Sequence, residues 1–377
     1  RKFLKPQILG VALPKDPALV VPLVENGELS LWLNRSIQNK ELEDRCDQAL
    51  SEAKKDAGGS NFADRAACTM AIALAPESPI FYKNLKFTPA GLGNLLMEAV
   101  YFKKDLSAFV DMIQSSIIAF WGKCAPTQTA GTGEAINRIG NCQRFLSQNM
   151  IGYGLERCIY YLCPMAPCLS EKLEGFYVRT ADDYLRALEV LSSSKKRPEW
   201  FLDRHIVAFL SVRDKSIIEP FLADIGSSEK YRQRQGVLKM FAAIQRRDKM
   251  GQMPGLSLWV GDMLDMLIDR YHDRDKRKKV REQLEKIKNQ GSLDRIAVLF
   301  DNYNDIQMDM RNYTEMMRVY QILKKEYLVL ENELSTNPKF GIDVGRQAAM
   351  LASGAVAAVV ILLYLFFSMA NGGGKIF

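Results

Sequence analysis

Histidine is scarce in this sequence, which contains only His205 and His272 among 377 residues. Histidine is the side chain that most often transfers protons near neutral pH, and it is also a common zinc ligand. Its scarcity leaves little room for acid–base catalysis, and no dinucleotide-binding fingerprint or phosphate-binding loop compensates for it. The sequence therefore predicts no catalytic residue, no cofactor and no metal ligand, and a protein without enzymatic activity is favoured.

Cysteine is absent after Cys168, although the chain has seven cysteines. Cys158, Cys163 and Cys168 form a cluster in which each member lies five residues from the next. This spacing lacks the short pairs typical of zinc sites, and no local signature pairs a cysteine with His205 as a nucleophile. We expect free, buried thiols; one or two disulfides are the alternative, and a metal site ranks last.

Charge is absent from Ala348 to Ala370, a stretch of 23 residues. As a helix this stretch would be about 34 Å long, enough to cross the roughly 30 Å hydrocarbon core of a bilayer. We expect a single transmembrane helix here, with the lipid bilayer as its partner. Gly354 and Ala358 lie four residues apart and would allow another helix to approach closely within the membrane.

The residues on either side of this stretch predict its orientation. Only residues 371–377 follow it, so the bulk of the protein is expected on one side. Lys339 and Arg346 precede the stretch and Lys375 follows it, a bias that places the bulk on the cytoplasmic, matrix or stromal side. The first residue is Arg1, which fits either an incomplete chain or a processed precursor destined for an organellar membrane, thylakoid or mitochondrial inner.

Proline is absent between Pro254 and Pro338. Residues 256–290 and 293–335 are therefore expected to form two long helices that meet at Gly291 and Ser292 as an antiparallel hairpin. The second helix contains an apolar row with seven-residue spacing: Leu299, Ile306, Tyr313, Tyr320, Tyr327 and Leu334. A companion row changes sides part-way, from Ile296, Tyr303, Met310 and Met317 to Met316, Leu323 and Leu330. Such drift favours a straight helix packed against its own domain over a long two-stranded coiled coil.

Strand signals are confined to the N-terminal region. Residues 19–24 and 28–34 are β-rich, and the turn sequence Glu25-Asn26-Gly27 between them predicts a β-hairpin. The rest of the chain has helical patterning without a fixed repeat. We therefore expect a mainly α protein: an irregular multi-helix domain with a small N-terminal β-hairpin, a long helical hairpin and a single C-terminal transmembrane helix. The expected segments are an N-terminal arm (1–35), a helical domain (36–254), the helical hairpin (255–335), a juxtamembrane linker (336–347), the transmembrane helix (348–370) and a short tail (371–377).

Positive charge is concentrated in residues 227–296. This segment contains 17 Lys or Arg and 10 Asp or Glu, a surplus of 17 − 10 that equals the +7 of the whole chain. Its densest part is a candidate patch for an anionic partner: Arg274, Lys276, Arg277, Lys278, Lys279 and Arg281. Anionic lipid or an acidic protein surface would be attracted to it, whereas the absence of interleaved aromatic residues makes nucleic acid the weakest candidate. A solvated helix face with local ion pairs explains the run equally well.

These features predict a single-pass, membrane-anchored helical scaffold, linker or accessory subunit without enzymatic activity. Its partners would be the bilayer and other protein subunits of a membrane complex. One alternative is a membrane-anchored enzyme whose site has no recognisable motif. Another is a tail-anchored trafficking or fusion factor, because a heptad-like helix precedes the expected span; its tyrosine-rich positions and the lack of a central Gln or Arg layer argue against this alternative.

Overall fold

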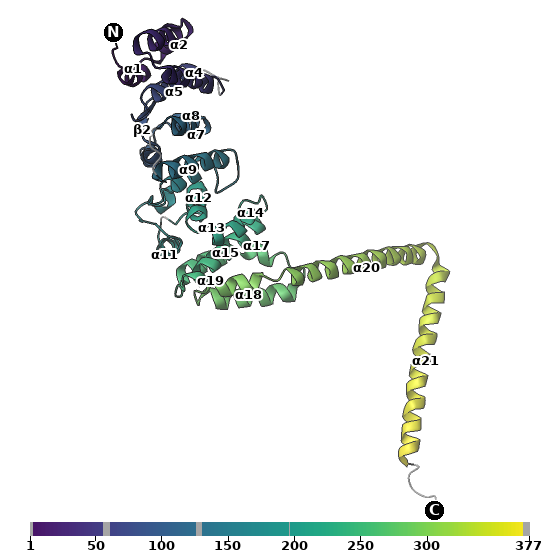
Figure 1. Ribbon diagram of the computed structural model, residues 1–377. Coiled ribbons are helices and arrows are strands. Elements are labelled where there is room, and N and C mark those ends of the chain that lie inside the picture. The colour runs from purple at the N-terminus through teal and green to yellow at the C-terminus, as the bar shows by residue number, and fades with distance from the viewer. Residues whose placement is uncertain (1–2, 56–60, 126–129, 196, 372–377) are drawn as a thin grey trace, which may run out of the picture. The chain divides into compact units, whose positions relative to one another are not determined.

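The computed structural model describes residues 3–55, 61–125, 130–195 and 197–371. They divide into two units, the first within residues 1–269 and 278–302 and the second within 270–277 and 303–377 (Figure 1). The fold is mainly helical, with two short strands and a long apolar C-terminal helix, as expected. Short 3-10 or π-helical turns cover Leu13–Lys15, Pro17–Leu19, Leu33–Ile37, Pro89–Gly91, Glu171–Leu173 and Glu219–Phe221.

The α-helices from the N-terminus to the middle of the chain are α1 (Pro6–Ala12), α2 (Val20–Glu25), α3 (Glu28–Trp32), α4 (Lys40–Lys55), α5 (Phe62–Leu74), α6 (Leu92–Tyr101), α7 (Ser107–Gln114), α8 (Ile117–Cys124), α9 (Ala130–Leu146) and α10 (Leu155–Leu162). The next are α11 (Ala181–Ser192), α12 (Arg204–Arg213), α13 (Lys215–Ile218), α14 (Leu222–Ile225), α15 (Lys230–Arg247), α16 (Pro254–Asp262) and α17 (Asp265–Ile268). The last are α18 (Arg274–Lys288), α19 (Leu293–Phe300), α20 (Tyr303–Thr336) and α21 (Pro338–Asn371).

Residues 19–34, expected to form a β-hairpin, are helical instead. α2 ends at Glu25, Asn26 keeps a right-handed conformation with φ −76°, and only Gly27 is left-handed, with φ +71°. An Asn-Gly hairpin turn of type I′ needs positive φ at both residues. The prediction was wrong at these residues because the positive φ of a glycine separates two helices as readily as it closes a hairpin.

The small β-hairpin of the N-terminal region lies about fifty residues further along the chain. Strands β1 (Ile80–Tyr82) and β2 (Leu85–Phe87) pair antiparallel, with Ile80 opposite Phe87 and Tyr82 opposite Leu85. All four of these side chains are buried, and β1 packs against α5. Lys83 in the connecting turn has φ +51°, a conformation that its neighbours in sequence gave no reason to expect.

The hydrophobic core of the first unit runs from the N-terminal helices to α19. Helix α4 packs on α5, α10 on both α9 and α12, α11 on α16, and α15 on both α14 and α19. Phe201 lies at the centre of an aromatic cluster, with ring centroids 5.3 Å from Phe241 and 4.4 Å from Trp259. Tyr184 joins this cluster and donates its hydroxyl hydrogen to the Phe201 carbonyl at 2.9 Å. Helices far apart in sequence are thus held together by burial of large apolar side chains.

The turn expected at Gly291 and Ser292 is present. Gly291 has φ +74°, and a Cβ there would lie 2.6 Å from the Met253 nitrogen, so only glycine fits. The Gln245 amide donates to the Gly291 carbonyl at 3.1 Å and accepts from the Leu293 nitrogen at 2.9 Å. Ser292 caps α19 by accepting a hydrogen bond from the Arg295 nitrogen at 3.3 Å.

The two arms of the expected helical hairpin are shorter than the sequence indicated. Residues 256–290 contain the separate helices α16, α17 and α18, and residues 293–335 contain α19 and most of α20. Gln235 donates to the carbonyl of Phe300, and Lys239 pairs with Asp301 at 2.7 Å, where α19 ends. Side chains of α15 therefore provide polar partners for the residues at the C-terminal end of α19. The absence of proline from the sequence does not indicate that a helix ends here.

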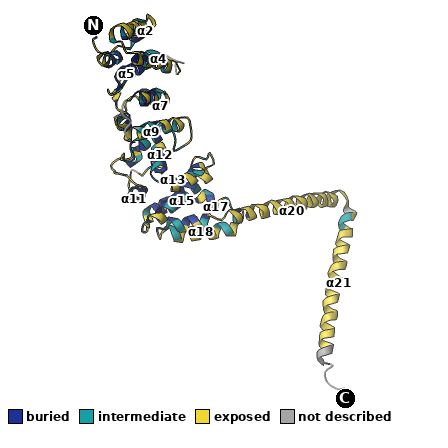
Figure 2. Ribbon diagram, viewed as in Figure 1, coloured by how far each residue is buried: buried dark blue, intermediate teal, exposed yellow. Residues whose placement is uncertain are grey.

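The second unit consists of residues 270–277, α20 and α21 within the described chain. Asp309 is buried and accepts hydrogen bonds from the backbone nitrogens of His272 at 2.6 Å and Asp273 at 3.2 Å. The ring of His272 stacks on that of Tyr313 with centroids 4.0 Å apart. The first part of the expected apolar row does pack, because Ile296 and Leu299 of α19 join the core of the first unit and Ile306 of α20 is buried. From Tyr313 onward the side chains of the row are exposed (Figure 2), so the expected packing is not found in that part of α20.

Candidate functional site

α21 contains the candidate membrane span. Lys339–Phe367, 29 residues, is long and apolar enough to cross a bilayer, and none of these residues is buried. The expected linker residues 338–347 continue the same helix, while 372–377 of the expected tail lie outside the described residues. The pair Pro6–Lys15 and Pro17–Glu25 reaches this apolar character only when joined across a 118° bend. Leu9 and Val20 of that pair belong to the core, so α21 is the better candidate.

Gly354 and Ala358, the residues expected to pack against another helix in the membrane, both lie on α21 and are exposed. A Cβ at Gly354 would have no described atom within 4 Å. Their four-residue spacing places them on one side of the helix. This small-residue surface is therefore accessible to an incoming helix.

α20 carries an exposed apolar strip that we name the α20 seam. Its members repeat every three or four residues and are all exposed: Tyr313, Met316, Tyr320, Leu323, Tyr327, Leu330 and Leu334. Tyr320 and Leu323, in its middle, are each 57% exposed. Single exposed apolar residues are common on soluble proteins, whereas a continuous apolar strip over more than three heptads is typical of interaction surfaces.

The basic run of α18 is partly neutralised within the chain. Lys276 pairs with Asp305 at 3.0 Å, and this hydrogen bond raises the pKa of Lys276. Arg277 donates to the His272 carbonyl at 3.5 Å. Arg281 lies 3.9 Å from Asp265. The remaining members are exposed and have no ion pair among the described residues: Arg274, Lys278 and Lys279.

The three clustered cysteines are buried, free thiols in different surroundings. Cys158 lies 3.6 Å from the Cys142 carbonyl, and Cys163 lies 3.1 Å from the side-chain oxygen of Asn94. Burial raises the pKa of Cys168 to about 12. Because the thiolate is the nucleophilic form, such a thiol is unreactive near neutral pH. No three His, Cys, Asp or Glu residues within the described ranges converge as a metal site.

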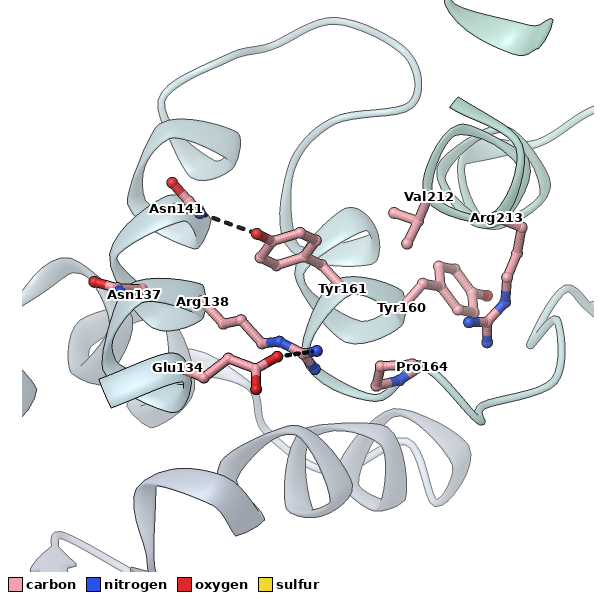
Figure 3. Close-up of a pocket in the computed structure, with 9 residues that line it drawn as sticks. All are labelled: Glu134, Asn137, Arg138, Asn141, Tyr160, Tyr161, Pro164, Val212 and Arg213. Atoms are coloured by element: carbon pink, nitrogen blue, oxygen red, sulfur yellow. Dashed lines mark hydrogen bonds and ion pairs between the residues drawn. The ribbon is translucent and has the colours of Figure 1, made fainter. Parts of the chain in front are cut away.

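A cavity of about 440 Å³ lies among α9, α10 and α12 (Figure 3). Glu134 and Arg138 of α9 pair at 2.6 Å, and Asn141 donates to the Tyr161 hydroxyl at 2.9 Å. Both interactions are drawn as dashed lines in Figure 3. On the other side, Arg213 donates to the Ala166 carbonyl at 2.7 Å while its buried Nε has no described partner. Burial lowers the pKa of Arg213.

His205 lies next to the cavity-lining Tyr160 and is a candidate proton carrier. The hydroxyl of Tyr160 lies 3.1 Å from Nδ1 of His205 and accepts a hydrogen bond from the Leu169 nitrogen at 2.9 Å. Burial lowers the pKa of His205 and raises that of Tyr160, so both are neutral near pH 7. This network can hold α10 to α12, and its neutral groups offer no activated nucleophile.

No sequence pattern indicates this cavity, because its lining residues come from positions 134–213 and no spacing connects them. The exposure of the Tyr and Met residues of α20 has no sequence signal either, since an apolar row alone does not say whether its packing partner lies in the same chain. No family model, no curated protein and no solved structure matches this chain.

Proposed function

We propose that this protein is a membrane-anchored helical scaffold or accessory subunit without enzymatic activity. The observation that carries the proposal is α21, whose 29-residue apolar stretch has no buried residue. An apolar helix of this length is unfavourable in water and is accommodated by a bilayer. The large first unit would then be held at the membrane surface and would present its helices to other subunits.

Two further observations support this proposal. The α20 seam, directly before α21, is an exposed surface suited to helix pairing. The thiols of Cys46 and Cys168 have pKa values raised to about 12 by burial, which removes them as nucleophiles near neutral pH. Both observations favour binding over catalysis.

The decisive experiment is carbonate extraction of membranes that contain the full chain. We expect the chain to remain in the membrane pellet, and a variant lacking residues 338–377 to be soluble and folded. Val359→Arg places a charge near the middle of the apolar stretch and should reduce insertion, since it costs about 2.5–3.5 kcal/mol there. Val329→Arg is the matched control, because Val329 in α20 is equally exposed, at 57% against 55%. Extraction of the unmodified chain by carbonate would refute membrane anchoring.

A second candidate, a tail-anchored trafficking factor, is favoured by the exposed seam immediately before α21. Such a factor would connect two membranes through α20. Vesicles of neutral lipid that carry the full chain would then cluster, as measured by dynamic light scattering. A scaffold that acts within one membrane leaves the vesicles dispersed.

A further inference from the structure

The α20 seam forms an uninterrupted heptad pattern. In the usual a–g labelling, the a positions are Tyr313, Tyr320, Tyr327 and Leu334, and the d positions are Met316, Leu323 and Leu330. Upstream, Ile306 is buried, whereas Tyr313 stacks on His272 of the same chain with one face and remains 44% exposed. The regular heptads from Tyr313 onward are therefore accessible to another helix.

The sizes of the seam residues distinguish the two directions in which a second copy could pair. In a parallel pair each a residue faces its own counterpart, so three layers would hold two tyrosines each. In an antiparallel pair a faces d. Centred between Gln321 and Ile322, that arrangement places Tyr313 opposite Leu330, Tyr320 opposite Leu323 and Tyr327 opposite Met316. Each large ring then meets a smaller side chain, which favours close packing.

The flanking charges distinguish the same two directions. A parallel pair places Glu326, at g, against Glu331, at e of the other copy, and like charges there are destabilising. In the antiparallel pair e faces e and g faces g. Lys324 then lies beside Met317, and Glu326 beside Val319, so no like charges are opposed. The packing and the charges favour the same direction.

We propose that α20 pairs with α20 of a second copy of this chain as an antiparallel coiled coil centred between Gln321 and Ile322. This inference rests on the proposed scaffold function, whose partner it identifies. The pairing is isologous, because every contact occurs twice about a two-fold axis. It would bury the seam side chains from Tyr313 to Leu330, which are exposed in the single chain.

The proposed pairing also constrains the α21 helices. Asn337, the residue between α20 and α21, lies 15.5 positions from the centre, so the two junctions would be separated by about 46 Å along the paired helices. At that separation Gly354 and Ala358 of the two copies cannot meet. These small residues remain available to helices of other subunits.

Cross-linking of engineered cysteines in the full chain, reconstituted in lipid nanodiscs, tests the direction of pairing. Chains with Tyr320→Cys are mixed with chains carrying Leu323→Cys and treated with a mild oxidant. We expect links between Cys at 320 and Cys at 323 to exceed same-position links at least fivefold. The seven native thiols are buried and should not interfere. Predominant same-position links would overturn the antiparallel arrangement.

The control mixes Arg318→Cys with Lys325→Cys chains. In the proposed arrangement the residue numbers of two facing positions sum to 643, as 320 and 323 do. Positions 318 and 325 have the same sum, so they lie at matching heights along the pair, but both occupy outward f positions. We expect at least tenfold less linking than for the seam pair. Equal linking in the control would show random collision rather than a defined interface.

A second measurement compares Leu323→Glu with Ile322→Glu by sedimentation in mild detergent. The two residues are adjacent and similarly exposed, at 57% and 50%, but only Leu323 belongs to the seam. We expect a monomer–dimer equilibrium in the unmodified chain, a tenfold weaker dimer for Leu323→Glu and little change for Ile322→Glu. An unmodified chain that stays monomeric would refute the proposal, as would equal effects of the two variants. Carbonate extraction is read separately, so failure of membrane anchoring is distinguishable from failure of this pairing.

Discussion

The first unit and the two long helices α20 and α21 use the same secondary structure in opposite ways. Most helices of the first unit bury one face against neighbours far away in sequence, and Phe201, at the centre of one such contact, is 2% exposed. α20 and α21 are each 34 residues long, and the described residues buried in them are Ile306 and Asp309. Most helical stability in proteins comes from packing of an apolar face. The exposed apolar faces of these two long helices are the reason for our proposal that their packing partners lie outside the chain.

The largest expected difference in stability between the two regions comes from removing a central side chain of the first unit. Phe201→Ala leaves a cavity between Phe241 and Trp259 and should lower the free energy of unfolding by about 3–5 kcal/mol. Val329→Ala removes an exposed apolar side chain of α20 outside the seam and should change the free energy of unfolding by less than about 0.5 kcal/mol. Urea unfolding of the full chain in mild detergent measures both. Similar losses for the two variants would mean that α20 is packed as tightly as the core.

A backbone substitution gives the next largest effect. Gly291→Ala introduces a side chain at φ +74°, which costs about 1–3 kcal/mol before the contact with Met253 is counted. Gly140 of α9 is the matched control, because a Cβ there would have no described atom within 4 Å. Gly140→Ala should be neutral or stabilising by about 0.5–1 kcal/mol. Thermal unfolding would contradict this account if Gly291→Ala were as stable as the unmodified chain.

The smallest effect concerns a partly buried carboxylate of α7, Asp111, and its dependence on pH. Burial alone would raise the pKa of Asp111, but hydrogen bonds from Tyr82 and Arg65 outweigh it, so the pKa is lowered. Asp111 therefore stabilises the fold above its unfolded pKa of about 3.9, and this contribution is lost as the pH falls through the lower folded value. Asp111→Asn should cost about 1–2 kcal/mol at pH 7.

The same variant should flatten the acid limb of a stability–pH profile, because it removes the group that titrates there. Urea midpoints measured between about pH 2 and pH 5 test this expectation, because the contribution of a carboxylate with a lowered pKa is lost in that range. A profile of unchanged steepness would show that other carboxylates dominate acid unfolding.

Local signals predicted those parts of the fold that depend on few residues. Thr180 and Asp183 form a capping box at the beginning of α11, a start signal that four neighbouring residues supply. The turn at Gly291 was predicted because glycine can adopt positive φ where the chain reverses. The hairpin at residues 19–34 failed for a related reason, since Gly27 adopts positive φ between two helices.

The candidate sites, too, could be predicted only where neighbouring residues define them. The charge-free stretch of 23 residues is recognisable from the sequence alone, and α21 forms the expected helix over it. The cavity beside Tyr160 and Arg213 had no sequence signal, because its lining residues are assembled only when α9, α10 and α12 pack together. Such a cavity depends on contacts between distant segments, and a single sequence does not contain those distances.

The sequence by itself determined that the chain is mainly helical and ends in an apolar helix, because helical periodicity and the absence of charge are properties of neighbouring residues. It also contained the heptads of α20. Only the tertiary structure decided whether their apolar face is core or surface, because burial depends on whether another part of the chain reaches it. Residues 270–277 reach Asp309 and Tyr313, and the tyrosines and leucines beyond them are left exposed.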